Sequence, residues 1–176
     1  MQETPHTDGS VLTTLFRHNA WANLALLEFC QGLSDTQLDT TAVGCFGSIR
    51  DTLQHIVVAE ISYVNRVTGA TPPGKLAPGE FPGFDLLKDS VRWTSDQLLR
   101  LAFSAQNDTR VQQRLPDQPL KQYPLASLIA QALTHSTEHR TQISAIITQM
   151  GMEPPDMSGW KYMETMGEIQ LVDEEA

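Results

Sequence analysis

The sequence predicts an all-α protein, built as a four-helix bundle with long crossover connections. Apolar residues recur at steps of three and four along four long stretches of the 176-residue chain, which is the spacing of a helix with one buried face. Between the second and third stretches, the Pro/Gly-rich residues 70–83 are too many for a tight helical hairpin. Four amphipathic helices with long connections are typical of a bundle, so we expect one such domain over residues 10–155.

The first predicted helix covers about residues 10–30 and ends before Gly32, a common stop signal. Two polar residues, Asn19 and Asn23, interrupt its otherwise apolar stripe. A short turn at residues 34–38 follows this helix. The full stripe consists of Leu12, Leu15, Phe16, Asn19, Ala22, Asn23, Leu26 and Cys30.

The second predicted helix begins after Ser48, which forms a capping-box pattern with Asp51, and it ends near Gly69. The third predicted helix extends from Phe84 to about Asn107. The stripe of the second helix consists of Ile49, Leu53, Ile56, Val57, Ile61 and Val64. The stripe of the third helix consists of Phe84, Leu87, Val91, Thr94, Leu98, Leu101 and Ala105.

Two short extended arms, residues 109–115 and 120–123, are predicted on either side of a turn at residues 116–117. The fourth helix then begins after Pro124 and ends at Gly151. Its inward stripe consists of Leu128, Ala132, His135, His139, Ile143, Ile146 and Met150.

The ends of the chain are predicted to lie outside the bundle, as a disordered tail at residues 1–9 and an acidic tail at residues 156–176. The formal net charge is -9, from 12 basic and 21 acidic residues, so we expect no nucleic-acid partner. No run approaches the roughly 18 to 20 apolar residues of a membrane span, and we expect no membrane partner. Cys30 and Cys45 lack CxxC spacing and the first residues are polar, which favours a cytoplasmic protein with reduced thiols.

His135 and His139 indicate a divalent-metal site, because they lie on a stripe that is otherwise apolar. Four helical residues rise about 6 Å and turn through slightly more than one full turn, so both imidazoles leave the same side of the helix. A buried polar ring needs a partner, which is either a hydrogen-bonding group or a metal ion. The pair alone leaves both interpretations open.

His55, in the second predicted helix, is the third candidate ligand. Three neutral nitrogen ligands suit zinc, nickel, copper or ferrous iron, and an all-histidine set with one open position is typical of a catalytic zinc site. We therefore predict that His55, His135 and His139 bind a divalent metal. The other histidines, His6 and His18, are expected at the surface. Small neighbours along the helix leave room beside His55, namely Thr52, Ala59 and Ser62.

Other polar and aromatic residues have two interpretations. Asn19 and Asn23 are interpreted as a buried amide pair that caps backbone groups, with support of the metal ligands as the alternative. Glu138 lies about 100° around its helix from the nearest histidine, so we expect an exposed acid rather than a general base. Trp160 and Tyr162 either cover the bundle end as a lid or anchor the tail, and we favour the anchor.

Residues 135–139 also match the H-x-x-E-H string of inverzincin proteases. A string this short occurs by chance. Those enzymes take a downstream carboxylate as their third ligand, whereas His55 lies upstream here, so the match receives little weight. Glu60 is the other carboxylate near the ligand segments, and no role is assigned to it.

Three motifs, taken together in order and spacing, resemble the signatures of the DinB/YfiT-like metalloenzymes. The resemblance covers about residues 10–155. The chain departs from the family pattern at His18, Glu138 and Thr141, none of which is a predicted ligand. The motifs are His18-Asn-Ala-Trp-Ala-Asn23 with residues 33–35, residues 47–56 with residues 59–60, and residues 135–143 with residues 150–151.

The resemblance implies a four-helix bundle, often dimeric, with a divalent metal on three histidines, which by motif are His55, His135 and His139. Relatives of this fold include transferases and isomerases that use low-molecular-weight thiols such as bacillithiol or mycothiol, where the metal is thought to activate the thiolate. We therefore expect a homodimeric, thiol-dependent S-transferase-like enzyme that uses zinc, nickel or iron and acts on a small molecule. The alternatives are a metal-dependent hydrolase and a non-catalytic, metal-stabilised module for dimerisation or binding.

Overall fold

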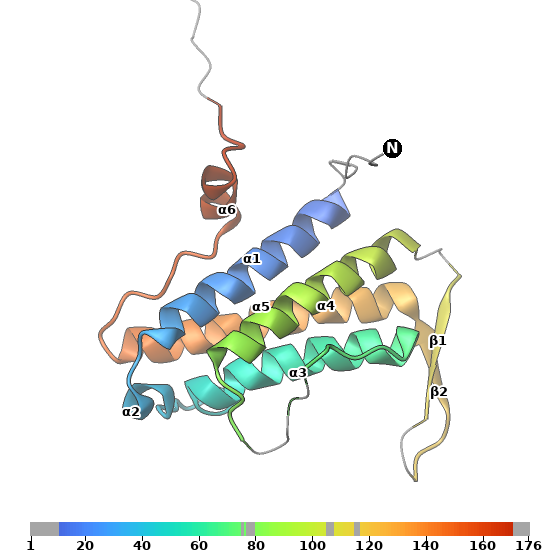
Figure 1. Cartoon of the computed structure of the whole chain (residues 1–176), viewed down its shortest axis with the longest axis horizontal. Coiled ribbons are helices and arrows are strands. Elements are labelled where there is room, and N and C mark those ends of the chain that lie inside the picture. The colour runs from blue at the N-terminus through green and yellow to red at the C-terminus, as the bar shows by residue number, and fades with distance from the viewer. Residues whose placement is uncertain (1–10, 75, 77–79, 105–107, 115–116, 171–176) are drawn as a thin grey trace, which may run out of the picture.

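The structure is a computed structural model, and it describes residues 11–74, 76, 80–104, 108–114 and 117–170. The prediction of a mostly helical fold is confirmed (Figure 1). The four long helices are α1 (Val11–Gln31), α3 (Ile49–Thr68), α4 (Phe84–Ser104) and α5 (Leu125–Gln149). The shorter described elements are α2 (Asp35–Leu38), β1 (Arg110–Gln113), β2 (Lys121–Pro124) and α6 (Gly159–Thr165).

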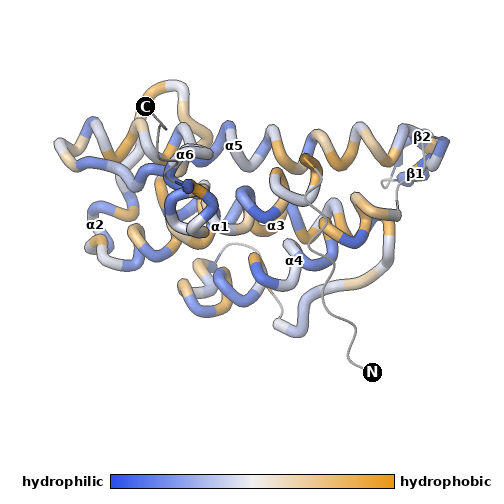
Figure 2. The backbone as a smooth tube through the Cα atoms, turned by 90° about the horizontal axis from the view of Figure 1, so that it is seen from above, coloured by the Kyte–Doolittle hydropathy of each residue, from blue (hydrophilic) through white to orange (hydrophobic). Residues whose placement is uncertain are grey.

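The four long helices form a bundle in which α1 and α3 each pack against both α4 and α5 (Figure 1). Hydrophobic and hydrophilic residues alternate along these helices, as expected where each helix buries one face (Figure 2). The apolar core consists of two clusters. The first includes Leu26, Ile56, Val91 and Ile146, and the second includes Phe16, Val64, Leu98 and Leu128.

A layer of buried polar residues separates the two apolar clusters. On each long helix, the polar residues that belong to this layer lie in the sequence between the residues of one apolar cluster and those of the other. This polar layer therefore lies at the middle of the bundle, and it includes the predicted ligand His139. The buried polar residues of the layer are Asn19, Asn23, Glu60, Thr94, Ser136, His139 and Arg140.

Local signals in the sequence explain where α3 begins and ends. Ser48 and Asp51 form the predicted capping box: Ser48 Oγ accepts from the Asp51 N–H at 3.1 Å, and Asp51 Oδ2 accepts from the Ser48 N–H at 3.3 Å. Gly69 follows the helix with a φ of 71°, a left-handed conformation that glycine adopts without strain. The predicted bounds of this helix are confirmed, and they place His55 in its second turn.

The predicted extended arms form a short antiparallel hairpin at one end of the bundle (Figure 1). Val111 of β1 pairs with Tyr123 of β2 and is buried against the second apolar cluster. The Leu125 N–H then donates to the Thr109 carbonyl oxygen at 2.9 Å. The hairpin therefore leads directly into α5 and fixes the start of that helix.

The helix α6 lies within residues 156–176, the range predicted as an acidic tail, and it packs against α1. Tyr162 is buried and meets the rings of His18 and Trp21 edge-on, each at a centroid distance of 5.5 Å. His18 Nε2 donates to the Met157 carbonyl oxygen at 2.9 Å. The expectation of a surface position for His18 was wrong, because the segment before α6 returns across α1 and covers this ring. Tyr162 is the anchor, whereas Trp160 is 76% exposed and is neither anchor nor lid.

One predicted core position is also wrong. Leu15 is 46% exposed, although it was placed on the inward stripe of the first helix. Its neighbour Phe16 occupies the core position, because the buried residues follow the steps from Thr13 through Phe16 to Asn19.

Several predictions fall outside the described residues, namely the disordered tail at residues 1–9 with His6, the position of Ala105, the end of the third helix at Asn107, and the turn at Pro116. Of the helices that the structure describes, none has the length and hydrophobicity needed to cross a membrane.

Candidate metal centre

Three histidine side chains from two helices meet at the polar layer. His55 extends from α3, and His135 and His139 extend from α5 one turn apart. One ring nitrogen of each lies within 4.8 Å of those of the other two. The Nε2 atoms of His55 and His135 are 3.1 Å apart, and the centroid of the His139 ring lies 4.7 Å and 4.4 Å from the centroids of these rings. The structure thus brings together the three histidines that the sequence singles out.

The side chain of Gln142 fixes the orientation of the His139 ring. Gln142 Oε1 accepts from the Phe46 N–H at 3.2 Å, which identifies this atom of the amide as the oxygen. The same oxygen lies 2.8 Å from His139 Nδ1, so Nδ1 must carry a proton and donate it. In the neutral ring, Nε2 then keeps its lone pair, which is the form that a metal binds. The sequence prediction did not include Gln142, although its position three residues after His139 on one helix was a usable signal.

Burial keeps two of the imidazoles uncharged. It lowers the pKa of His55 below the ordinary value of 6.5, and repulsion between the protonated forms of His55 and His139 lowers it further. Burial also lowers the pKa of His135 to about 4, with His139 and His55 adding to the decrease and Glu138 opposing it. At neutral pH these rings are therefore neutral, and each offers a lone pair.

Aromatic side chains line the histidine cluster. Phe46, in the loop before α3, stacks on His55 with centroids 4.0 Å apart and meets His139 edge-on at 5.3 Å. Tyr63 of α3 meets His135 edge-on at 5.9 Å. Phe46 is 54% exposed, so this ring forms the outer wall of the cluster.

The spacing of one pair of ring nitrogens, those of His55 and His135, fits a tetrahedral ion. Zinc–nitrogen bonds of about 2.0–2.1 Å at tetrahedral angles place two ligand nitrogens about 3.3 Å apart. The 3.1 Å between His55 and His135 is close to that value. The alternative of two hydrogen-bonded core histidines has one contact for each ring, namely His135 Nε2 with His55 Nε2 and His139 Nδ1 with Gln142 Oε1. The buried Nδ1 of His135 has no hydrogen-bond partner within the described part of the chain. The three histidines could therefore hold a divalent metal ion.

A second polar cluster, which we call the Glu60 network, draws one or more residues from each long helix. The carboxylate of Glu60 is 0% exposed. Its Oε1 accepts from the side chains of Asn19, Asn23 and Ser136 at 2.8, 2.9 and 2.8 Å. Its Oε2 accepts from Thr94 Oγ1 at 3.0 Å. The members of the network are Asn19 and Asn23 of α1, Glu60 of α3, Thr94 of α4, and Ser136 and Arg140 of α5.

Arg140 supplies the positive charge of the Glu60 network. Its Nη1 donates to the amide oxygens of Asn19 and Asn23 at 2.7 and 2.6 Å, and the amide nitrogens of these residues donate to Glu60. Burial lowers the pKa of Arg140 to about 10, against the opposing effect of Glu60, so the guanidinium stays charged at neutral pH. The prediction that the two asparagines cap backbone groups was wrong. They bridge two buried charges, which form stronger hydrogen bonds than neutral backbone groups do.

Neither carboxylate near the ligand segments is placed to act as a general base. Glu138 is exposed on α5, as expected. Glu60 is fully buried, and both of its oxygens accept hydrogen bonds. The sequence did contain a signal for this burial, because Glu60 lies on the apolar side of its helix, four residues after Ile56 and four before Val64.

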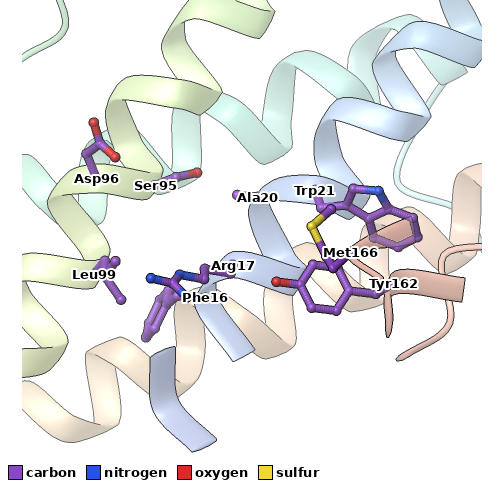
Figure 3. Close-up of a pocket in the computed structure, with 9 residues that line it drawn as sticks. All are labelled: Phe16, Arg17, Ala20, Trp21, Ser95, Asp96, Leu99, Tyr162 and Met166. Atoms are coloured by element: carbon purple, nitrogen blue, oxygen red, sulfur yellow. The ribbon is translucent and has the colours of Figure 1, made fainter. Parts of the chain in front are cut away.

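A cavity of about 400 Å³ lies on the outside of the bundle, between α1, α4 and α6 (Figure 3). Arg17, Trp21, Asp96 and Tyr162 are among its lining residues. It shares no residue with the histidine cluster or the Glu60 network, so it is not part of the candidate metal centre.

A model of the DinB family matches residues 1–172, a range that contains the whole bundle and the three histidines. No curated protein was found to be similar to the chain.

Proposed function

This chain belongs to the DinB family, and we propose that it is an enzyme that depends on one divalent ion, zinc, nickel or iron, held by His55, His135 and His139. In its reaction, the sulfur of an intact low-molecular-weight thiol forms a bond to an electrophilic carbon of a small-molecule substrate, the thiol proton passes to solvent, and the group displaced from that carbon leaves with the electrons of its bond. The observation that carries the proposal is the convergence of three imidazoles from two helices, with one nitrogen of each within 4.8 Å of the others.

Each histidine has surroundings that suit a ligand. Gln142 holds the proton on Nδ1 of His139 and leaves Nε2 free. The Nε2 atoms of His55 and His135 lie 3.1 Å apart, and the lowered pKa values of both rings reduce competition from protons. A dication held by neutral ligands keeps its full charge, and it would lower the pKa of a thiol or a water molecule bound to it.

The carboxylates near the site support a thiol rather than water as the activated group. Hydrolysis benefits from a positioned base that accepts a proton from water. Glu60 already accepts hydrogen bonds on both oxygens, and Glu138 is an exposed acid. A coordinated thiol is deprotonated by coordination itself and needs no carboxylate.

Elemental analysis of protein purified without chelator tests the metal proposal. After loading with zinc, nickel and ferrous iron in turn, we expect about one ion per chain. His55→Ala, His135→Ala and His139→Ala should each sharply reduce metal affinity, whereas the control His18→Ala should not. Metal content near zero under all three loading conditions would contradict the proposal.

The visible spectrum of the cobalt-loaded protein tests the thiol proposal. Addition of cysteine, glutathione, bacillithiol or mycothiol should change the absorption if sulfur enters the coordination shell. Unchanged spectra with all four thiols, together with ester or amide turnover that a chelator abolishes, would indicate a hydrolase. A bound metal without any turnover would indicate a metal-stabilised binding module.

A further inference from the structure

The Glu60 network joins the same two helices that carry the three histidines, and we propose that it fixes their relative position. Glu60 is then a positioning residue: its bonds set the rotation and the height of α5 against α3, and thereby the angle at which His135 and His139 meet His55. This inference rests on the proposed function, because it assigns the network a role in the geometry of that site.

Two pairs of residues lie side by side on α5. His135 and His139 are four residues apart, and so are Ser136 and Arg140, so each pair forms a short stripe along the helix. The two stripes are about 100° apart around the helix axis. One stripe forms the histidine cluster, and the other enters the Glu60 network. Because the helix is rigid, a rotation or a shift that moves one stripe moves the other stripe equally.

The same coupling exists on α3. His55 and Glu60 are five residues apart on this helix, a rise of about 7.5 Å. One rigid helix therefore carries a residue of the histidine cluster and the central residue of the Glu60 network. Ser136 Oγ donates to Glu60 at 2.8 Å and links the helices directly. This bond therefore fixes the distance between α3 and α5 close to the three histidines.

The Glu60 network constrains α5 more strongly than the histidine cluster does. Glu60 has no exposed surface, so loss of the Ser136 donor cannot be replaced by bulk water and costs free energy. In the histidine cluster, the contact between the Nε2 atoms of His55 and His135 at 3.1 Å links α3 to α5, and His135 Nδ1 has no partner among the described residues. Of the two polar clusters, the Glu60 network therefore contributes more to the position of α5.

Thr94 offers an internal control. Its hydroxyl also donates to Glu60, at 3.0 Å, and it is buried like that of Ser136. Thr94 belongs to α4, which contributes no histidine to the site. Removing this hydroxyl takes one donor from Glu60 without releasing α5.

Metal affinity and the cobalt spectrum of three variants test the proposal. Glu60→Gln and Ser136→Ala should weaken metal binding by about tenfold to a hundredfold, the range seen when a group that orients a ligand is lost. Their cobalt absorption bands should shift, because the angles between the ligands change. Thr94→Val should keep the wild-type affinity and spectrum, although it removes a hydroxyl of the same kind. Urea unfolding of all three variants measures the accompanying loss of stability.

A second readout does not need the metal. Long-range proton–nitrogen NMR spectra of the metal-free protein report the tautomer and the hydrogen bonding of each ring nitrogen. Ser136→Ala should shift the Nε2 signals of His55 and His135, which are 3.1 Å apart in the wild type. Thr94→Val should leave these signals in place.

The outcomes separate the two proposals. If Glu60→Gln and Ser136→Ala lose stability but keep the wild-type affinity, cobalt spectrum and ring signals, Glu60 only stabilises the fold and the positioning proposal is wrong. If the wild type binds no ion, the proposed function fails, and the ring signals of the metal-free variants still decide the positioning role. If Glu60→Gln does not fold, Ser136→Ala decides, because it removes a single hydroxyl.

Discussion

The bundle buries two polar clusters in one layer, and they differ in how completely their hydrogen-bonding capacity is used. Glu60 accepts on both oxygens, and Arg140 donates to both asparagines and to Thr137. In the histidine cluster, His139 has one bond to Gln142, whereas the buried Nδ1 of His135 has none within the described residues. A cluster whose charged groups are bonded to neighbouring helices holds these helices together, whereas one with free lone pairs can bind a ligand.

The two clusters also differ in their access to solvent. The Glu60 network draws on all four long helices and lies between the two apolar clusters of the core. The histidines come from α3 and α5 alone, and their outer wall is the half-exposed ring of Phe46. A charged network requires exclusion of water to keep its short bonds strong, whereas a reactive site requires a route for its substrate.

The largest effect should follow from removing one charge of the Glu60 network. Arg140→Met leaves the buried carboxylate of Glu60 without its cation, and we expect the free energy of unfolding to fall by about 3–5 kcal/mol. Urea unfolding measures the change. The double variant Glu60→Gln/Arg140→Met should lose less than the sum of the single variants. Arg92→Met, which breaks only an exposed pair with Asp89, is the control and should change stability by less than about 1 kcal/mol. Equal losses in Arg140→Met and Arg92→Met would remove the distinction between the clusters.

A smaller effect should follow from filling the histidine cluster. A divalent ion at a free concentration one hundred times its dissociation constant should raise the free energy of unfolding by about 2.7 kcal/mol, because it binds the folded state. Unfolding with and without a chelator measures this increase. His135→Ala should show none of it. An equal increase in the wild type and in this variant would place the ion elsewhere.

Loss of the hydrogen bond that orients His139 should have a still smaller effect, on metal affinity. Gln142→Met removes the acceptor of the Nδ1 proton, and we expect about tenfold weaker metal binding, equivalent to about 1.4 kcal/mol. Competition with a coloured chelator measures the affinity. Gln149→Met changes an exposed glutamine of the same helix and serves as the control. If both variants bind as the wild type does, His139 is held by other contacts.

The smallest effect on the site is expected from His18, a histidine outside both clusters. His18→Ala loses the bond to the Met157 carbonyl oxygen, so unfolding should become easier by about 1 kcal/mol. Metal content should not change. A lower metal content in this variant would add α1 to the metal centre and weaken the contrast between the two clusters.

The elements that the sequence predicts well depend on neighbours along the chain. The apolar stripes set the buried face of each helix, and the pattern at Ser48 and Asp51, together with Gly69, sets the bounds of α3. The histidine cluster could be predicted from the sequence for a related reason. His135 and His139 lie one turn apart on a single helix, so their common direction follows from helical geometry.

The features that the sequence did not predict depend on contacts between helices. Arg140 meets Asn19, which lies 121 residues earlier, and His18 meets Met157 from the other end of the chain. Spacing within one helix defines its faces, but it does not determine which faces of two helices meet. For this reason the asparagines were assigned to backbone capping, and Glu60 received no role.

The Glu60 network also bears on the order in which the bundle assembles. Its hydrogen bonds join residues between 34 and 121 positions apart in the sequence, and contacts across such loops form late in folding. During synthesis, Glu60 emerges 76 residues before Ser136, its nearest partner on α5. Until α5 is available, this carboxylate keeps its water, since burying it with too few donors is costly. We therefore expect α1, α3 and α4 to remain loosely associated, and the arrival of α5 to complete the fold in one cooperative step.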